Sequence, residues 1–172
     1  MSDHSLPKTV DPLKYADQNR VLEGNIAVKL LPRLCEVLAE DTGDVAVKLE
    51  FDRDGQHLRI LKGSLDANLS LTCERCLNSV EKLIESRFTV GIVLTDEQAK
   101  NLPRSYEPLL VEPDTLVLQD VIEEELILSL PMFAYHDHCD SEHGMQTEAS
   151  DNEPLVEREN PFSVLSDLKL KK

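Results

Sequence analysis

The sequence predicts an α+β fold in which an antiparallel β-meander, forming an open sheet or a partial barrel, is covered by one or two helices. Three observations support this prediction. Apolar and polar residues alternate along most of the stretch from Leu22 to Leu94, as in half-buried strands. Short turn sequences separate these segments, so neighbouring strands should run antiparallel. A segment with helical periodicity, Leu116 to Leu130, follows and can cover the apolar face of the sheet.

The first part of the chain predicts a lead-in, one strand and a short helix. Residues 1–19 are mostly polar, and Pro7 and Pro12 discourage a helix there. Alternation from Leu22 to Leu30 predicts the first strand. Pro32 suits the first turn of a short helix, because its missing N–H has no partner at that position in any case. We expect this helix to bury Leu34, Val37 and Leu38, with Cys35 beside them as a small core residue.

The next part predicts the remaining strands of the meander. Alternation is clearest from Val45 to Phe51, and a turn at residues 52–55 follows. Leu58 and Ile60 begin another strand, which we expect to end in a turn at Gly63 and Ser64. The last two predicted strands cover residues 65–73 and 80–94. Within the second of these, Gly91 indicates a bulge or the close approach of another segment.

The covering helix is predicted from a clear apolar stripe. Before it, residues 96–100 predict one helical turn, and Leu109 with Val111 predicts a short strand. The apolar stripe of the helix comprises Leu118, Val121, Ile122 and Leu126. Glu123 and Glu124 are expected to face water, and Pro131 should end the helix.

These elements give a domain organisation for all 172 residues. Residues 20–139 are expected to form a single α+β domain. Residues 140–159 are strongly acidic and nearly free of apolar side chains, which predicts a disordered linker. Residues 160–172 predict a short amphipathic helix, with Asn160 as N-cap and Phe162, Leu165 and Leu168 on one face. Two interpretations remain for this helix: it docks on its own domain, or it binds a partner.

Composition and charge exclude several classes of function. The formal net charge of -15 is concentrated in the covering helix and the acidic linker, which argues against a general DNA-binding protein. No apolar run approaches the length of a membrane span, so we expect no membrane association. The polar start predicts no signal peptide, and the four cysteines are then expected to be reduced or metal-bound. The predicted location is the cytoplasm.

Two clusters of potential metal ligands stand out. Cys73 and Cys76 lie at the expected tip of a hairpin, as in zinc knuckles, and a second group occupies positions 136–139. From these clusters we predict one structural zinc ion held by Cys73, Cys76, His136 and Cys139, with His138 as a further candidate ligand. The alternative is a set of reduced cysteines near histidines. A thioredoxin-like redox role is disfavoured, because a strand and not a helix follows the pair.

The sequence contains no positive sign of catalysis. No Ser-His-Asp or Gly-rich phosphate-binding signature is present, and the adjacent residues Glu123 to Glu125 point in different directions on a helix. A catalytic zinc would need an open position and a base, and the sequence displays neither. We therefore predict a protein without enzymatic activity.

Cations near the hairpin strands suggest a binding face. Arg59, Lys62, Arg75 and Lys82 are the candidates for contact with RNA or a protein partner. The same spacing also occurs on an ordinary solvated sheet face, which is the alternative interpretation.

Four sequence segments, taken in order, resemble the bacterial YceD family, the large ribosomal RNA subunit accumulation proteins. They are Leu69 to Cys76, which fits LxLxCxRC; Leu102 to Pro108, which fits LP…YEP; Asp120 to Cys139, with DVIEEELILSLP…HDHC; and Asn160 to Lys169, with NPFSVLSDLK. The resemblance covers most of the chain after about Val45. Each segment alone would be unspecific, but their combination in this order is specific.

The resemblance implies a cytosolic, non-enzymatic role in the synthesis, processing or stability of 23S ribosomal RNA, and so in assembly of the large subunit. The implied partners are 23S rRNA or its precursor, ribosomal proteins or assembly factors. A protein–protein adaptor is the alternative. In that case the acidic segment and the C-terminal helix would bind a basic partner, and the effect on rRNA would be indirect.

Overall fold

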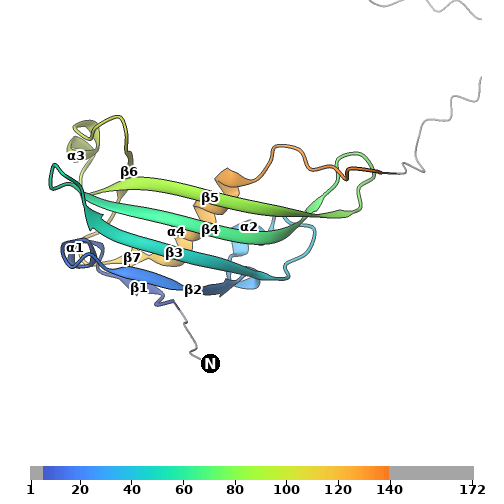
Figure 1. Cartoon of the computed structure of the whole chain (residues 1–172), viewed down its shortest axis with the longest axis horizontal. Helices are drawn as coiled ribbons and strands as arrows, with labels where there is room; N and C mark the ends of the chain where they lie inside the picture. Colours follow the sequence, from blue (N-terminus) through green and yellow to red (C-terminus); the bar gives the residue numbers. More distant parts are fainter. Residues whose placement is uncertain (1–5, 140–172) are drawn as a thin grey trace, which may run out of the picture. The chain divides into compact units, whose positions relative to one another are not determined.

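The computed structural model describes residues 6–139 and contains a five-stranded sheet with the order β2-β3-β4-β5-β6 (Figure 1). The strands are β2 (Val21–Ala27), β3 (Asp44–Arg53), β4 (Arg59–Thr72), β5 (Ser79–Val93) and β6 (Glu107–Leu110). Strands β2 to β5 form an antiparallel meander. The two outer strands of this order, β2 and β6, are not paired with each other, so the sheet is open and the predicted α+β class is confirmed.

Helix α4 (Leu118–Ser129) lies across one face of the sheet, which we call the core face; the opposite face is the open face (Figure 1). The predicted stripe of α4 is buried, as are Val45, Val47, Leu49 and Phe51 of β3. Full burial of one such aliphatic side chain stabilises the fold by about 1.5–3 kcal/mol. The short helix α2 (Pro32–Cys35) follows a 3-10 turn, η1 (Val28–Leu30), and also contributes to this core.

The lead-in contains a helix, contrary to the prediction. Helix α1 (Pro12–Asp17) begins with Pro12 at its first position, where proline is compatible with a helix. The side chain of Asp11 caps this helix by accepting a hydrogen bond from the N–H of Lys14 at 2.9 Å. Tyr15 then packs edge-on against Phe51, with 5.4 Å between ring centroids. Ahead of α1, β1 (Thr9–Val10) pairs with β7 (Leu116–Val117).

The predicted turn at Gly63 and Ser64 is wrong, because β4 continues through both residues. Gly63 lies directly opposite Phe88 of β5. A Cβ atom at position 63 would overlap the ring of Phe88, so glycine is needed for the ring to lie across β4 and not for a change of direction. The prediction for Gly91 is confirmed, since a Cβ atom there would overlap the side chain of Leu102.

Two further predictions, which concern the burial of Val37 and Glu123, are also wrong. Val37 lies beyond the end of α2 and is exposed, whereas Leu34 is fully buried. Glu123 is only 4% exposed and does not face water. Its carboxylate accepts a hydrogen bond from the backbone N–H of Leu34 at 3.0 Å. Since α2 has no side-chain cap of its own, Glu123 satisfies one of the free N–H groups of its first turn.

Strand β6 departs from the predicted antiparallel pattern. It pairs with residues Val90–Val93 of β5 in parallel. The connection includes helix α3 (Asp96–Lys100), which was predicted as a helical turn, and it brings the chain back so that β6 runs in the same direction as β5. A parallel neighbour needs such a crossover and cannot be joined by a tight hairpin. No helix within residues 6–139 is long and apolar enough to cross a membrane.

Candidate functional site

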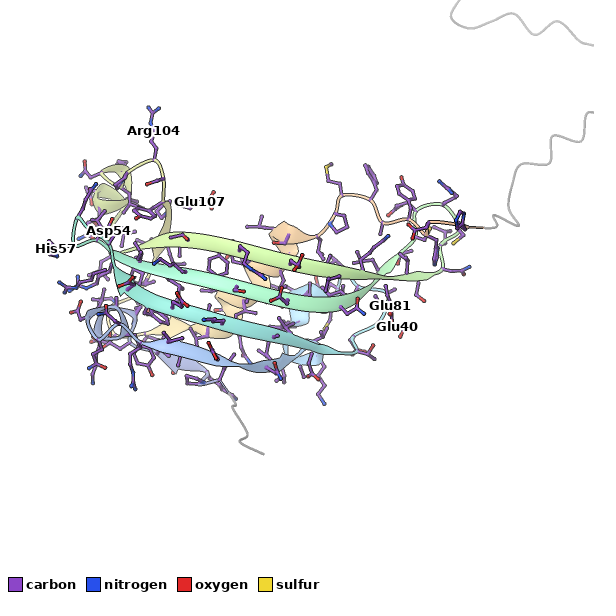
Figure 2. All side chains as sticks on the ribbon, in the orientation of Figure 1. Glu40, Asp54, His57, Glu81, Arg104 and Glu107 are labelled. Carbon is purple, nitrogen blue, oxygen red and sulfur yellow. The ribbon has the colours of Figure 1, made fainter. Side chains whose placement is uncertain are left out.

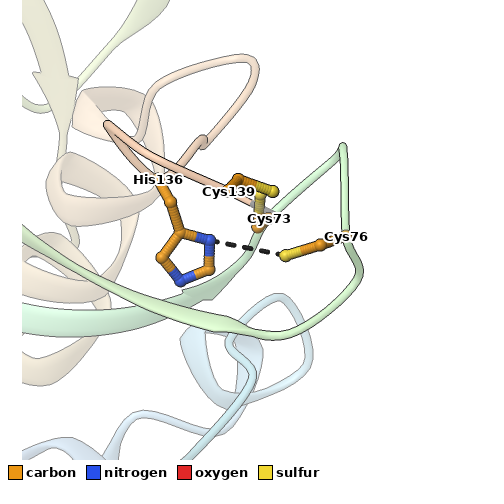
Figure 3. Close-up of side chains that lie close together, drawn as sticks. All are labelled: Cys73, Cys76, His136 and Cys139. Atoms are coloured by element: carbon orange, nitrogen blue, oxygen red, sulfur yellow. Dashed lines mark hydrogen bonds between the residues drawn. The ribbon is translucent and has the colours of Figure 1, made fainter. Parts of the chain in front are cut away.

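Four potential metal ligands converge where the β4–β5 turn meets the chain that follows α4 (Figure 3). Cys73 and Cys76 belong to the turn, and His136 and Cys139 to the later segment. One ligand atom from each side chain lies within 4.8 Å of all the others. These are the four residues predicted from sequence. His138, the further candidate, is exposed and is not a member of the group.

Backbone contacts bring the two segments of this metal-ligand corner together. The N–H of Glu74 donates to the carbonyl of Ala134 at 2.9 Å, and Cys73 forms a parallel bridge with Ala134. A small cluster of buried residues supports the same contact and consists of Leu71, Cys73, Val80 and Ala134. The turn is closed by a hydrogen bond of 2.8 Å from the N–H of Leu77 to the carbonyl of Cys73. Packing and backbone hydrogen bonds therefore hold the two ligand-bearing segments together, independently of any bound metal.

The orientation of His136 suits a metal ligand. Its Nε2 atom lies 3.0 Å from the carbonyl oxygen of Ser79, which can only accept, so Nε2 carries the proton. Nδ1 lies 3.5 Å from Sγ of Cys76 and is the ring nitrogen that faces the cysteines. A carbonyl that holds the second ring nitrogen is the usual outer contact of a metal-bound histidine. In a tetrahedral zinc site, ligand atoms are about 3.5–3.8 Å apart, given bond lengths near 2.0–2.3 Å.

Two thiols of the corner, those of Cys73 and Cys139, have strongly shifted pKa values. Burial raises the pKa of Cys73, but backbone N–H groups of Cys76, His136 and Arg75, together with the His136 side chain, outweigh it and lower the pKa to about 5. The pKa of Cys139 rises to about 11, because of its hydrogen bond to Cys76, burial and the nearby Cys73. The surroundings therefore favour the thiolate of Cys73 and oppose that of Cys139 unless a cation neutralises the negative charge. Three sulfur atoms and one imidazole are a donor set compatible with zinc.

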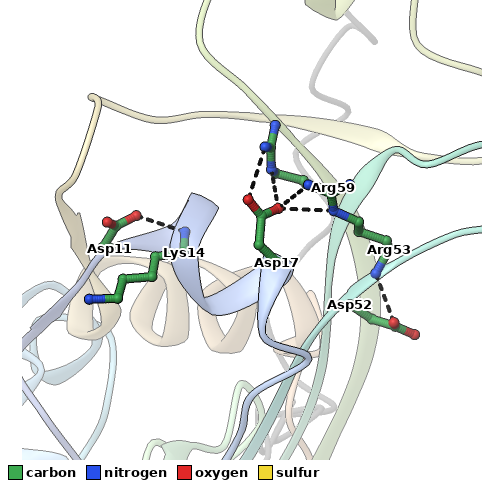
Figure 4. A network of polar contacts seen from close by, with 6 residues as sticks. All are labelled: Asp11, Lys14, Asp17, Asp52, Arg53 and Arg59. Atoms are coloured by element: carbon green, nitrogen blue, oxygen red, sulfur yellow. Dashed lines mark hydrogen bonds and ion pairs between the residues drawn. The ribbon is translucent and has the colours of Figure 1, made fainter.

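The four predicted contact cations do not lie on one face of the sheet. Arg59 lies on the core-face side at one end of β4, where it and Arg53 bind the carboxylate of Asp17 (Figure 4). Lys62 follows buried Leu61 in β4, so its side chain points to the opposite, open face.

The other two predicted cations lie near the metal-ligand corner. The guanidinium carbon of Arg75 lies 5.7 Å from the ring centroid of Tyr135. Lys82 is directly opposite buried Leu69 and thus on the core-face side. Because β4 has 14 residues and is about 45 Å long, Arg59 and Arg75 lie near its opposite ends. A role of each cation in binding RNA stays a prediction, but a single basic face is excluded.

The open face is acidic overall, and its cations are already paired. Its three cations on β3, β4 and β5 are Lys48, Lys62 and Arg87. Lys62 pairs with Asp52 at 3.3 Å, and Arg87 with Asp66 at 2.9 Å. Lys48 lies within 3.2 Å of two carboxylates, those of Glu23 and Glu50. These three strands therefore present no free positive charge to phosphate groups on this face.

Sequence reasoning missed an exposed apolar surface beside the corner. Leu83, Met132, Phe133 and Tyr135 are all more than 40% exposed, and the rings of Phe133 and Tyr135 stack with centroids 6.5 Å apart. The available signal was the run from Met132 to Tyr135, in which apolar residues directly follow the proline that ends the helix. Their exposure depends on which side of the loop faces the sheet, and the alternation pattern does not contain that information.

The fold and the corner define a class: a small α+β domain with a compact group of three cysteines and one histidine between a hairpin and the chain after a covering helix. The model of one protein family, described as large ribosomal RNA subunit accumulation protein YceD, matches residues 61–169. The chain belongs to this family. It is 36% identical to the "Large ribosomal RNA subunit accumulation protein YceD" of Haemophilus influenzae, over 99% of this chain and all of the relative. No solved structure matches the chain significantly.

Proposed function

We propose that this chain is a ribosome-biogenesis factor that supports accumulation of 23S ribosomal RNA in the cytoplasm and acts by binding, without catalysis. The observation that carries the proposal is the similarity to a relative of this name over 99% of the chain and the relative's full length.

We further propose that Cys73, Cys76, His136 and Cys139 hold one structural zinc ion. Four protein ligands complete a tetrahedron, so no position is left for a water molecule or substrate. The ion would fix the β4–β5 turn to the segment after α4. The same closed donor set supports the absence of zinc-dependent catalysis.

The charge distribution favours a protein partner over direct contact with RNA phosphates. The cations of the open face are paired with carboxylates, and the formal net charge is -15. A ribosomal or assembly protein, basic in character, fits such a surface better. The second candidate function is an adaptor that binds its partner through residues 140–172, where the acidic linker and the amphipathic helix were predicted; these residues lie outside those that the structure describes.

The test combines a deletion with crosslinking. Cells that lack the gene should accumulate less 23S rRNA relative to 16S rRNA, and the intact chain should restore the ratio. A truncated chain that ends at residue 139 separates the candidates, because restoration by the truncated chain excludes the adaptor that depends on the tail. Ultraviolet crosslinking, with RNA and protein read from the same purification, then identifies direct contacts. An unchanged rRNA ratio in the deletion strain would refute the proposed function.

A further inference from the structure

Most of strand β5 has a free edge. On the side away from β4, β6 pairs only with Val90–Val93, and within residues 6–139 no strand pairs with residues 79–89 on that side. The segment has 11 residues and spans about 36 Å. Figure 1 shows the chain after α4 running alongside this edge without pairing with it over this length. A long edge with free N–H and C=O groups is a template for adding a strand.

Two hollows follow this edge and join into one groove. The first, of about 640 Å³, lies between Lys82–Glu85 of β5 and the segment from Ser129 to Asp137. The second, of about 710 Å³, lies between Glu85–Thr89 of β5 and the residues Glu107, Glu125 and Leu128. Both are lined by Glu85 and Ser129, so they adjoin each other along the edge of β5. We call this the edge groove.

The walls of the edge groove resemble those of a protein-binding site. Leu83, Leu128, Phe133 and Tyr135 are between 42% and 70% exposed and line it. Exposed aromatic and large aliphatic side chains at a concave site are typical of contacts that dominate protein association. The far end is closed by His136, whose Nε2 donates to the carbonyl of Ser79. The metal-ligand corner therefore also fixes one end of the groove.

The charge of the edge groove selects its occupant. Its carboxylates are Glu85, Glu107, Glu125 and Asp137, whereas its cations are Lys82 and Arg87. Arg87 is already paired with Asp66. Glu107, at the start of β6, lies on the same side of the molecule as the end of α4 (Figure 2). The pKa of Glu125 is raised by burial and by the nearby negative charges of Glu107 and Glu124. A positive charge in the groove would lower this pKa again. A second copy of this chain would bring the same carboxylates into opposition.

We propose that an extended, basic segment of another protein binds in the edge groove as an additional strand on β5, in line with β6. Main-chain hydrogen bonds to residues 79–89 would supply affinity. Alternate side chains of the segment would point towards α4. Among these, apolar side chains would enter the hollows beside Phe133 and Leu128, and lysine or arginine side chains would contact Glu107 and Glu125. This inference deepens the proposed function by naming the class of partner, and its test uses direct binding instead of rRNA levels.

The first experiment titrates the full-length, isotope-labelled chain with a ten-residue lysine–valine peptide. In this peptide, valine and lysine take turns at alternate positions and serine fills the positions between them, so that both side chains lie on one face of the strand. The amide signals of residues 79–89 should shift, and those of the alternate residues whose N–H groups point away from β4 should gain protection from hydrogen exchange. A peptide methylated on alternate backbone nitrogens keeps its charge but loses strand hydrogen bonds, and it should not bind. Equal binding of the methylated peptide, or shifts that do not involve residues 79–89, would overturn the proposal.

A charge-reversal pair tests the contact residues. Glu107→Lys with Glu125→Lys should weaken binding of the lysine–valine peptide by about tenfold or more. Glu36→Lys with Glu40→Lys makes the same change in net charge at exposed positions around the end of α2, and it should leave binding nearly unchanged. Equal weakening by both pairs would mean that net charge alone attracts the peptide, which contradicts a specific groove.

A photo-crosslinking residue at exposed Leu83 identifies the occupant in cells. A basic protein, crosslinked through an extended segment, supports the proposal. RNA, a second copy of the chain or the chain's own residues 140–172 would overturn it. The two proposals fail separately: normal 23S rRNA in the deletion strain refutes the role in rRNA accumulation, while strand addition on β5 is judged by the labelled amides.

Discussion

The carboxylate of Glu123 on α4 accepts a hydrogen bond from the backbone N–H of Leu34 on α2, 89 positions away in sequence, at 3.0 Å. Both residues are buried, and the contact joins the covering helix to the short helix that begins at Pro32. A helical position that sequence periodicity assigns to solvent thus becomes part of the core, because it satisfies a backbone donor that would otherwise be buried without a partner.

Loss of this contact should destabilise the domain. Glu123→Ala leaves the N–H of Leu34 without an acceptor and should lower the free energy of unfolding by about 1–3 kcal/mol. Glu123→Gln keeps an acceptor oxygen and should cost less. Urea unfolding of the purified chain measures both. Glu124→Ala, at an exposed position on the same helix, should change stability by no more than about 0.5 kcal/mol. Equal effects at both positions would contradict a specific role of Glu123.

The metal-ligand corner should contain zinc. Protein purified without a histidine tag should hold about one zinc ion per chain by elemental analysis, since the donor set is complete. Removal by a chelator should lower stability by about 4 kcal/mol, if zinc is present at a thousandfold excess over its dissociation constant.

Cysteine variants provide the control for the zinc prediction. Cys76→Ser should lose zinc and show a lower Tm. Cys35→Ser should retain zinc, because Cys35 lies outside the ligand group and a hydroxyl can keep its bond to the carbonyl of Val28. The assignment would be refuted if the purified protein contained no zinc and still bound none after refolding in the presence of added zinc.

The stabilisation that the ion pairs of Asp17 provide should be lost within a narrow acidic range of pH. Hydrogen bonds from Arg59 and then Arg53 lower the pKa of Asp17 to about 2, from an ordinary value of 3.8. Because the folded-state pKa is the lower one, this stabilisation is present above about pH 4 and is lost as pH falls towards 2.

Asp17→Asn should therefore reduce the steepness of the acid dependence of Tm between about pH 4 and pH 2. Asp41→Asn, outside the arginine cluster, should not alter that dependence in the same way. An Asp17→Asn profile parallel to that of the unmodified chain would show that the ion pairs do not couple to folding.

The contact between Gly63 and Phe88 should be strongly sensitive to size. Gly63→Ala places a methyl group where the ring of Phe88 lies and should destabilise the domain by roughly 1–3 kcal/mol. Combining it with Phe88→Ala should cost less than the sum of the two single changes, because the smaller side chain removes the overlap. Denaturant unfolding of the unmodified chain, both single variants and the double variant measures the difference. Strict additivity would mean that the overlap is relieved elsewhere.

Local sequence patterns determined much of this protein. Alternation over residues 45–51 identifies the buried face of β3, and the stripe of Leu118, Val121, Ile122 and Leu126 identifies α4. In both cases, neighbours along the chain differ in burial with the period of the element, so the pattern is visible without knowledge of the fold. The types and grouping of Cys73, Cys76, His136 and Cys139 likewise indicated that these four side chains form one cluster compatible with a metal site.

Only the tertiary structure decided the contacts between segments far apart in sequence. Gly63 suggests a turn from sequence alone, and only the position of Phe88 shows why a glycine is needed within the strand. Strand β6 is parallel to β5 because the connection through α3 returns the chain before β6 begins. Arg59 and Lys62 lie on different faces because their positions in β4 differ by an odd number of residues. The free edge of β5 depends on where β6 ends. Register and long-range pairing are set by the summed packing of many residues, so no local pattern contains them.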